Sequence, residues 1–302
     1  GASTVEALAA DSQRVDRDLI GQTVSHLIQQ RPDFIGMAVA FEPNALDGRD
    51  DQFLAHPHSN ETGRYVPYFF WKPDNTVGVD KLIMTAEGGI DGWYTRPLQL
   101  DHDLITPPYI YPVNGKDVPM TSAVSVVHRD GKPIGVVTTD VSLAAIVDRT
   151  ARLTPFGDGK VMIVGGDNLW VAQADKTHLA KPLKDAGLLA LADRAKKDGF
   201  AIEIRQGVLR AAVPARAPGV NDVWTVMLEA PMSAVMASAN RTLAMMVLAG
   251  LAFVAAALAL TWYAARQIVA PVEKMTGYMG DLAEGDYAAD TPFVDRADEI
   301  GG

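Results

Sequence analysis

The chain has 302 residues, of which 48% are hydrophobic and 21% charged, a composition typical of a folded protein with about two folded units. Its formal net charge of −10 disfavours nucleic acid as a partner, because phosphate binding needs a basic face. It contains no cysteine, which excludes disulfides, thiol nucleophiles and cysteine-based zinc sites.

Apolar residues at helical spacing predict a long amphipathic helix at the N-terminus. They are Val5, Leu8, Val15, Leu19, Val24 and Leu27. Residues 35–43 then indicate a buried strand that ends at Pro43, and residues 57–75 indicate a polar loop rich in prolines and aromatics. Residues 1–241 contain no apolar run of membrane length, so we expect an export or first membrane segment to precede this sequence.

Two β-rich runs joined at Asp130-Gly131 predict a hairpin, followed by a helix that begins near Asp140 or Ser142. A second cycle follows, with strand-like runs around a helical stretch at 184–197. In both cycles a β-run with an acidic residue leads into a small helix, VVTTDVSLAAIVD and VMLEAPMSAVMAS, which indicates an internal repeat.

Residues 242–265 carry no charge and predict a membrane-spanning helix. About 20 apolar residues at a rise of about 1.5 Å each cross a hydrocarbon core of roughly 30 Å. Trp262-Tyr263 suit the membrane interface at one end of the span. The alternative, a helix buried in a soluble core, needs enough protein to cover every face of the helix.

After the span, apolar residues spaced four, three, four and three apart form a short heptad seam. They are Ile268, Val272, Met275, Met279 and Leu282. The region resembles a HAMP signal-relay domain, with Pro271 after the membrane helix, LAEGDY at 282–287, Pro292 in the connector and DEIG at 298–301. The resemblance implies a homodimeric receptor of the bacterial inner membrane, with residues 266–302 in the cytoplasm, where a further output module contacts signalling proteins, and the N-terminal part in the periplasm.

Residues 3–240 resemble a double Cache extracellular sensor. The resemblance is carried by Trp93-Tyr94, PPYIYP at 107–112, DGKPIGVVTTDVSL at 130–143 and VWTVMLEAP at 223–231. It implies an α+β fold in which two stacked PAS-like antiparallel-sheet modules pack on the long N-terminal helix. We expect the distal module at about 33–148, the proximal module at about 155–232, the membrane helix at 242–265 and a truncated HAMP coiled coil at 266–302.

In these sensors the membrane-distal module usually holds the ligand, and the Trp-Tyr pair lines its pocket. In the amino-acid-binding members, an arginine two positions before the tryptophan grips the ligand carboxylate, and two aspartates take its ammonium group. Here Asp91 stands in place of that arginine and Tyr111 in place of the first aspartate, while Asp140 matches the second. The carboxylate clamp is therefore missing, with Arg96 as an unsupported substitute.

Aromatic and acidic residues make up the predicted ligand site, a combination that favours a cation. They are Asp140, Trp93, Tyr94, Asp91, Tyr109, Tyr111 and Trp71. Each ring face attracts a desolvated cation by roughly 0.5 to 2 kcal/mol, and a carboxylate adds charge. We therefore predict a cationic amine or quaternary ammonium ligand. The alternatives are that Trp93 and Tyr94 only fill the core, that Asp91 is a turn residue and that Asp140 only caps a helix.

Enzymatic functions find little support, because the sequence has neither a phosphate loop nor a Gly-x-Ser-x-Gly elbow. His56 and His58 flank Pro57, and without an evident third ligand a turn explains them better than a metal site. We predict a non-enzymatic chemoreceptor without cofactor or metal. The alternatives are the same sensor on a histidine kinase or cyclic-dinucleotide enzyme, and an ectodomain that reads a periplasmic partner protein.

Overall fold

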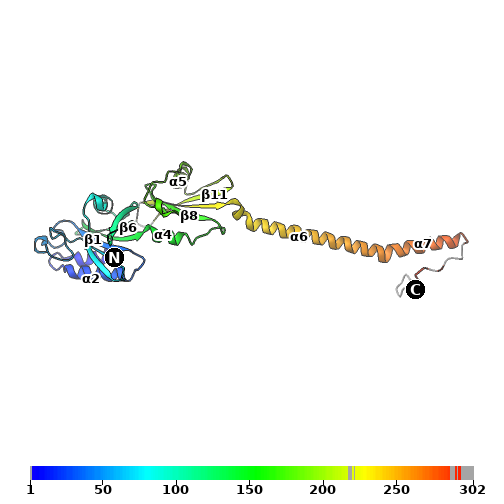
Figure 1. The fold of residues 1–302 in the computed structure, drawn as a ribbon, viewed down its shortest axis with the longest axis horizontal. Coiled ribbons are helices and arrows are strands. Elements are labelled where there is room, and N and C mark those ends of the chain that lie inside the picture. The colour runs from blue at the N-terminus through cyan, green and yellow to red at the C-terminus, as the bar shows by residue number, and fades with distance from the viewer. Residues whose placement is uncertain (1, 217–219, 221, 286–289, 291, 294–302) are drawn as a thin grey trace. The chain divides into compact units, whose positions relative to one another are not determined.

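The computed structural model describes all residues except 1, 217–219, 221, 286–289, 291 and 294–302. The chain divides into two compact units, residues 1–235 and 236–302. The first unit contains both β-sheets, and helices make up most of the described part of the second (Figure 1). Of the predicted HAMP motifs, the last two residues of LAEGDY (286–287) and the whole of DEIG (298–301) lie outside the described residues.

The N-terminal helix predicted as one element is divided into α1 (Ala2–Ala9) and α2 (Arg17–Gln29). The break has a local cause, because the Asp16 carboxylate accepts a hydrogen bond from the Leu19 amide at 3.0 Å and so caps a new helix. The break also changes which residues face inward, since Leu19 is 45% exposed. The residues of this segment that join the hydrophobic core are Val5, Ala9, Val15, Ile20, Val24 and Ile28.

A seven-stranded antiparallel sheet follows α2. Its strands are β1 (Gly36–Phe41), β2 (Pro67–Trp71), β3 (Val77–Lys81), β4 (Leu104–Ile105), β5 (Tyr109–Val113), β6 (Lys116–Arg129) and β7 (Lys132–Ser142). The order is β3-β2-β1-β7-β6-β4, with β5 also paired to β6. The predicted strand at 35–43 and the hairpin at Asp130-Gly131 are confirmed, and both turn residues have positive φ. The loop predicted at 57–75 is wrong in part, because β2 lies within it.

The two faces of this sheet carry separate cores because side chains alternate along each strand. One face packs against α1 and α2 through residues such as Val24, Phe69 and Val137. The other face packs against residues 82–113, with Trp93 and Tyr111 in its core. The short helices on this side are η2 (Ala86–Gly88), the π-helical η3 (Asp91–Thr95) and α3 (Arg96–Leu100), whereas η1 (Asp50–Gln52) contacts α2 through the ion pair of Asp50 with Arg17.

A second, five-stranded sheet follows α4 (Leu143–Thr150). Its strands are β8 (Lys160–Val164), β9 (Trp170–Ala172), β10 (Ala201–Arg205), β11 (Val208–Arg216) and β12 (Val223–Pro231), in the order β10-β11-β12-β8-β9. The remaining helices of this region are η4 (Lys176–His178) and α5 (Ala186–Asp198), which confirms the helix predicted at 184–197. Leu191 and Ala195 of α5 pack against Met227 on the sheet.

The end of β12 leads into α6 (Met232–Ala264), so the second small helix of the predicted repeat is instead the start of a long helix. The π-helical η5 (Ala265–Val269) and α7 (Ala270–Ala283) continue it. Pro271 lies in the first turn of α7, and the wider π turn just before it accommodates a residue that cannot donate a backbone hydrogen bond.

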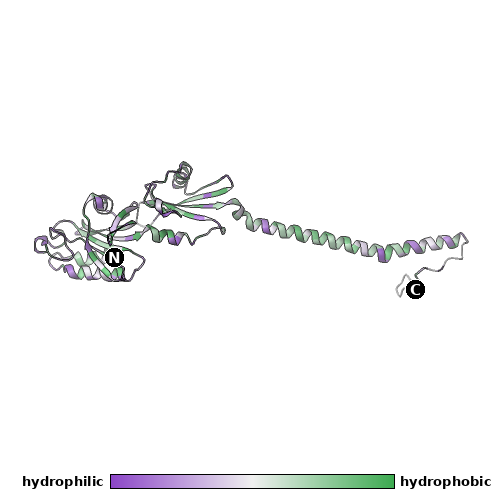
Figure 2. Cartoon of the chain, in the orientation of Figure 1, coloured by the Kyte–Doolittle hydropathy of each residue, from purple (hydrophilic) through white to green (hydrophobic). Residues whose placement is uncertain are grey.

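Among the described residues, the helical stretch Met232–Ala283 is the one long and apolar enough to cross a membrane. Its most apolar window has a mean hydropathy of 2.6, and none of that window is buried within the chain. Figure 2 shows hydrophobic residues along α6, whereas α7 mixes hydrophobic and hydrophilic residues. In α7 the seam residues Val272, Met275 and Met279 are exposed.

Candidate functional site

Asp140 lies near the end of β7 and is buried in the middle of the seven-stranded sheet. Its register partners on the two neighbouring strands are Gly36 on β1 and Ser122 on β6. The Ser122 hydroxyl donates a hydrogen bond of 2.6 Å to the Asp140 carboxylate. Ser122 has one proton to donate, so the Tyr109 hydroxyl, 2.7 Å away, donates to Ser122. Among the described residues, no cationic side chain pairs with Asp140.

Tyr68 and Tyr111 complete a cluster of tyrosines beside Asp140. The hydroxyl of Tyr68, on β2, lies over Gly36, where any Cβ atom would collide with it. The rings of Tyr68 and Tyr111 are 5.4 Å apart, and those of Tyr109 and Tyr111 are 6.4 Å apart. The Tyr111 hydroxyl accepts a hydrogen bond from the Ile83 amide at 3.0 Å. Three ring systems therefore lie around one carboxyl group.

The environment of Asp140 disfavours its charged form. Burial raises the pKa of Asp140 from 3.8 to about 6, although the hydrogen bond from Ser122 opposes the shift. Burial and the nearby Asp140 also raise the pKa of Tyr109 well above 10, and burial raises the pKa of Tyr111 to about 12. The phenols stay neutral, so at neutral pH the site holds a buried negative charge among polar but uncharged groups.

Trp93 belongs to this region through the glycine turn that precedes it. Its indole nitrogen donates a 2.7 Å hydrogen bond to the carbonyl oxygen of Gly88. Gly89 has a φ of +68°, and a Cβ there would lie 3.3 Å from the Tyr109 ring and 3.8 Å from Trp93. The turn therefore lies between the two rings and needs glycine both for its backbone conformation and for the close approach.

Two other predicted residues of the same segment point elsewhere. The buried Tyr94 hydroxyl interacts with Glu42 and Arg64. Glu42 follows β1 at the end opposite Gly36, and six residues of extended strand span about 20 Å. Asp91 is exposed at the start of η3. The structure does not bring the Tyr94 hydroxyl or Asp91 to Asp140.

Trp71 is also on the wrong side of the sheet for this cluster. Alternation along β2 places Tyr68 on the Asp140 face, whereas Trp71 packs with Phe69 on the α2 face. The predicted role of Trp71 beside Asp140 therefore disagrees with the structure. Arg96 likewise lies apart, since its exposed guanidinium is 3.9 Å from Asp222.

The helix-cap alternative for Asp140 is wrong, because Ser142 caps α4 and accepts a hydrogen bond from the Ala144 amide at 3.2 Å. Our reasoning from sequence missed Tyr68, Ser122 and Gly36. The hairpin at Asp130-Gly131 places β6 beside β7, so it pointed to the strand that carries Ser122 but not to Ser122 itself. No local pattern pointed to Tyr68.

Comparisons with known proteins match both the N-terminal and the C-terminal part of the chain to known domain families. Residues 20–148 match the family described as methyl-accepting chemotaxis protein-like, first PDC sensor domain, and residues 263–302 match the HAMP domain family. Methyl-accepting chemotaxis protein TlpQ of Pseudomonas aeruginosa is 30% identical over an alignment of 325 positions that covers 96% of this chain and 45% of TlpQ. The chain thus spans a little under half the length of this curated relative.

Solved structures share the fold of the sensor region. One is named methyl-accepting chemotaxis protein X, with 26% identity and a TM-score of 0.64 over 76% of this chain and 88% of that chain. Another is the extracellular domain of mmHK1S-Z3, described as a histidine kinase, with 24% identity and a TM-score of 0.65 over 80% of this chain and 87% of that chain. The fold of residues 1–235 is thus that of a PDC sensor.

Proposed function

We propose that this chain is a methyl-accepting chemotaxis receptor whose first sheet module binds a small cationic amine or quaternary ammonium compound at Asp140. Its residues 20–148 match the chemotaxis-type PDC sensor family and its residues 263–302 match the HAMP family. The observation that carries the proposal is a buried carboxylate without a cationic partner among the described residues. A ligand cation supplies the missing charge.

The energetics favour a cation over an anion. Ionising Asp140 in its buried position costs about 3 kcal/mol relative to water, because burial raises the pKa of this carboxyl from 3.8 to about 6. A bound cation offsets that cost, and each suitably placed ring of Tyr68, Tyr109 or Tyr111 adds roughly 0.5 to 2 kcal/mol. An anionic ligand would instead place a second negative charge beside Asp140.

The signal follows from the connectivity of the chain. The sensor unit leads through β12 directly into α6, and α6 leads through η5 into α7 of the HAMP region. A ligand shifts the receptor between two packings only if it binds one of them more tightly. In this proposal the receptor is a homodimer in the bacterial inner membrane, with its sensor in the periplasm, α6 in the lipid bilayer and the HAMP region relaying the change to cytoplasmic signalling proteins.

The test is calorimetric titration of the chain in lipid nanodiscs with choline, glycine betaine, a polyamine, several amino acids and small organic acids. Asp140→Asn removes the charge and retains the shape, and Asp117→Asn makes the same charge change at an exposed position of β6. We expect a cation to bind, with Asp140→Asn weakening it by about 30-fold or more, because removing one partner of a buried charge pair costs at least about 2 kcal/mol.

The control variant Asp117→Asn should bind as the unmodified chain does. Binding of an amino acid or organic acid in place of cations would refute the cationic ligand and leave the receptor class intact. If no compound of the panel binds, the result would favour the alternative of an ectodomain that binds a periplasmic partner protein.

A further inference from the structure

Three side chains of metal-binding type converge on the opposite side of the first sheet from Asp140. Asp18 comes from the first turn of α2, and His56 and His58 come from the segment between η1 and β2. One ligand atom from each residue lies within 4.8 Å of the other two. His56 Nε2 is 3.2 Å and His58 Nδ1 is 4.0 Å from Asp18 Oδ1.

These distances approach those of a coordinated ion. Zinc bonds to imidazole nitrogen and carboxylate oxygen are about 2.0–2.2 Å long, so neighbouring ligand atoms in a tetrahedral site are about 3.4 Å apart. The observed separations of 3.2 and 4.0 Å bracket that value. Asp18 has a side chain 68% exposed, so a small rotation of it can close the longer gap.

A second observation independently points to a ligand here. Nδ1 of His58 is buried and has no hydrogen-bond partner among the described residues. A buried polar nitrogen without a partner is costly, and a bound cation would satisfy it. The His58 ring packs against Tyr65 and Phe69, with centroids 5.9 and 5.5 Å away, so it is held in one position.

We propose that Asp18, His56 and His58 form a binding site for a divalent transition-metal ion of the zinc class, with solvent completing the coordination on the exposed side of Asp18. Two imidazoles and one carboxylate suit zinc, copper, nickel and iron, and do not suit magnesium or calcium, which prefer oxygen ligands. The site lies outside the cation-binding cluster at Asp140 and is independent of it.

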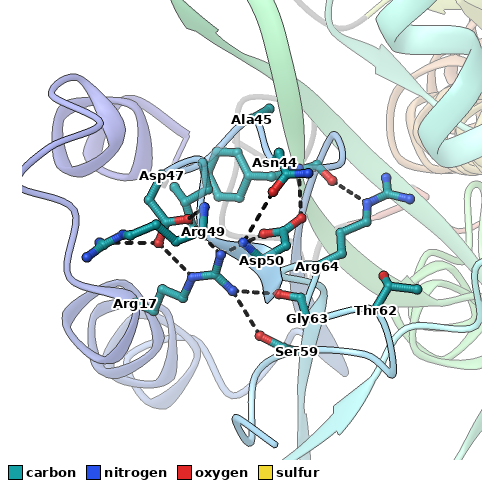
Figure 3. Close-up of polar contacts among 12 residues, drawn as sticks. Arg17, Asn44, Ala45, Asp47, Arg49, Asp50, Ser59, Thr62, Gly63 and Arg64 are labelled. Carbon is teal, nitrogen blue, oxygen red and sulfur yellow. Dashed lines mark hydrogen bonds and ion pairs between the residues drawn. The ribbon is translucent and has the colours of Figure 1, made fainter. Parts of the chain in front are cut away.

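Next to these three residues in the chain, Arg17 is the centre of a network of polar contacts (Figure 3). The buried Arg17 guanidinium donates hydrogen bonds of 2.6–3.1 Å to Asp47, Asp50, Ser59 and the carbonyl oxygen of Gly63. Arg17 precedes Asp18 and Ser59 follows His58, so the network fixes the backbone on both sides of the site. Its own charge is balanced by two buried carboxylates and does not oppose a cation nearby.

Gly21 and the backbone of the loop complete the arrangement. A Cβ at Gly21 would collide with the His58 ring, so glycine allows that ring to approach α2. Nδ1 of His56 accepts a hydrogen bond of 3.2 Å from the His58 amide, which leaves the proton on Nε2 to face Asp18. When a metal ion binds Nε2, the ring proton moves to Nδ1 through solvent, and the long contact with the His58 amide is lost.

The experiment uses the full chain without a histidine tag, in lipid nanodiscs, after treatment with a chelator. Equilibrium dialysis against Zn²⁺ followed by metal analysis measures stoichiometry and affinity. We expect one tight equivalent per chain, with Asp18→Asn and His56→Gln each weakening it at least tenfold. His178→Gln, at an exposed histidine in the second sheet module, is the matched control and should bind as the unmodified chain does.

Asp18 is exposed, so Asp18→Asn keeps the test valid if a histidine variant fails to fold. Zn²⁺ should also raise the unfolding temperature of the unmodified chain and of His178→Gln, and not that of Asp18→Asn. Co²⁺ should give a visible absorption band that disappears in His56→Gln. Equal zinc uptake by the unmodified chain and Asp18→Asn, or no uptake by the unmodified chain, would overturn the proposal.

Discussion

Replacing Asp140 by asparagine should make the unliganded sensor more stable while it removes the proposed ligand contact. Between pH 3.8 and about 6 the folded chain holds a proton on Asp140 that the unfolded chain has lost, so the free energy of unfolding falls as the pH rises through this window. The total loss is about 3 kcal/mol and is complete above pH 6. Asparagine keeps an acceptor for the Ser122 hydroxyl and carries no charge, so Asp140→Asn should recover up to about that amount at pH 7.5.

The assay is urea unfolding of the full chain in nanodiscs, followed by tryptophan fluorescence, at pH 7.5 and pH 4. The difference between Asp140→Asn and the unmodified chain should be large at pH 7.5 and small at pH 4. The exposed Asp117→Asn should show no difference at either pH. If Asp140→Asn is no more stable than the unmodified chain at pH 7.5, the buried-charge argument for a cationic ligand fails.

Three further variants test other parts of the structure. Gly36→Ala should lower the free energy of unfolding by about 1–3 kcal/mol and weaken cation binding, because its methyl group collides with the Tyr68 hydroxyl; unchanged urea unfolding and calorimetry would contradict this. In the unmodified chain, cation affinity should fall as the pH drops through about 6, because Asp140 takes up a proton. Ser122→Ala removes a hydrogen bond that lowers the pKa of Asp140, so in titrations across the pH range the affinity of this variant should begin to fall at a higher pH. Arg17→Ala removes the buried cation that pairs with both Asp47 and Asp50, so it should lower the free energy of unfolding in urea by about 3–5 kcal/mol; a loss under 1 kcal/mol would show that the network is not structurally important.

Local signals in the sequence were sufficient for several elements. The uncharged run at 242–265 predicted a helix of membrane length, and those residues lie in α6 and the first residue of η5. The Asp130-Gly131 pair predicted its hairpin because both positions need positive φ. The pattern after the span, with Pro271 at a helix start, pointed to the HAMP family that the comparisons show. Each of these signals lies within one continuous segment of the chain.

The composition of the site depended on contacts that no local pattern encodes. The turn at Asp130-Gly131 alone would pair Asp140 with Thr121, but a bulge between Val127 and His128 shifts the register by one residue and brings Ser122 opposite Asp140. Because side chains alternate, a shift of one residue exchanges the residues on the two faces of a strand.

The same alternation places Tyr68 on the Asp140 face of the sheet and Trp71 on the opposite face, although both belong to one aromatic run. Asp18 meets His56 and His58 because α2 packs on the sheet near the loop that precedes β2. The sequence by itself predicted the sensor and HAMP domains and the acidic character of the proposed site, since these depend on residue types and short spacings. Strand register and helix packing decided which side chains meet, because they join segments tens of residues apart.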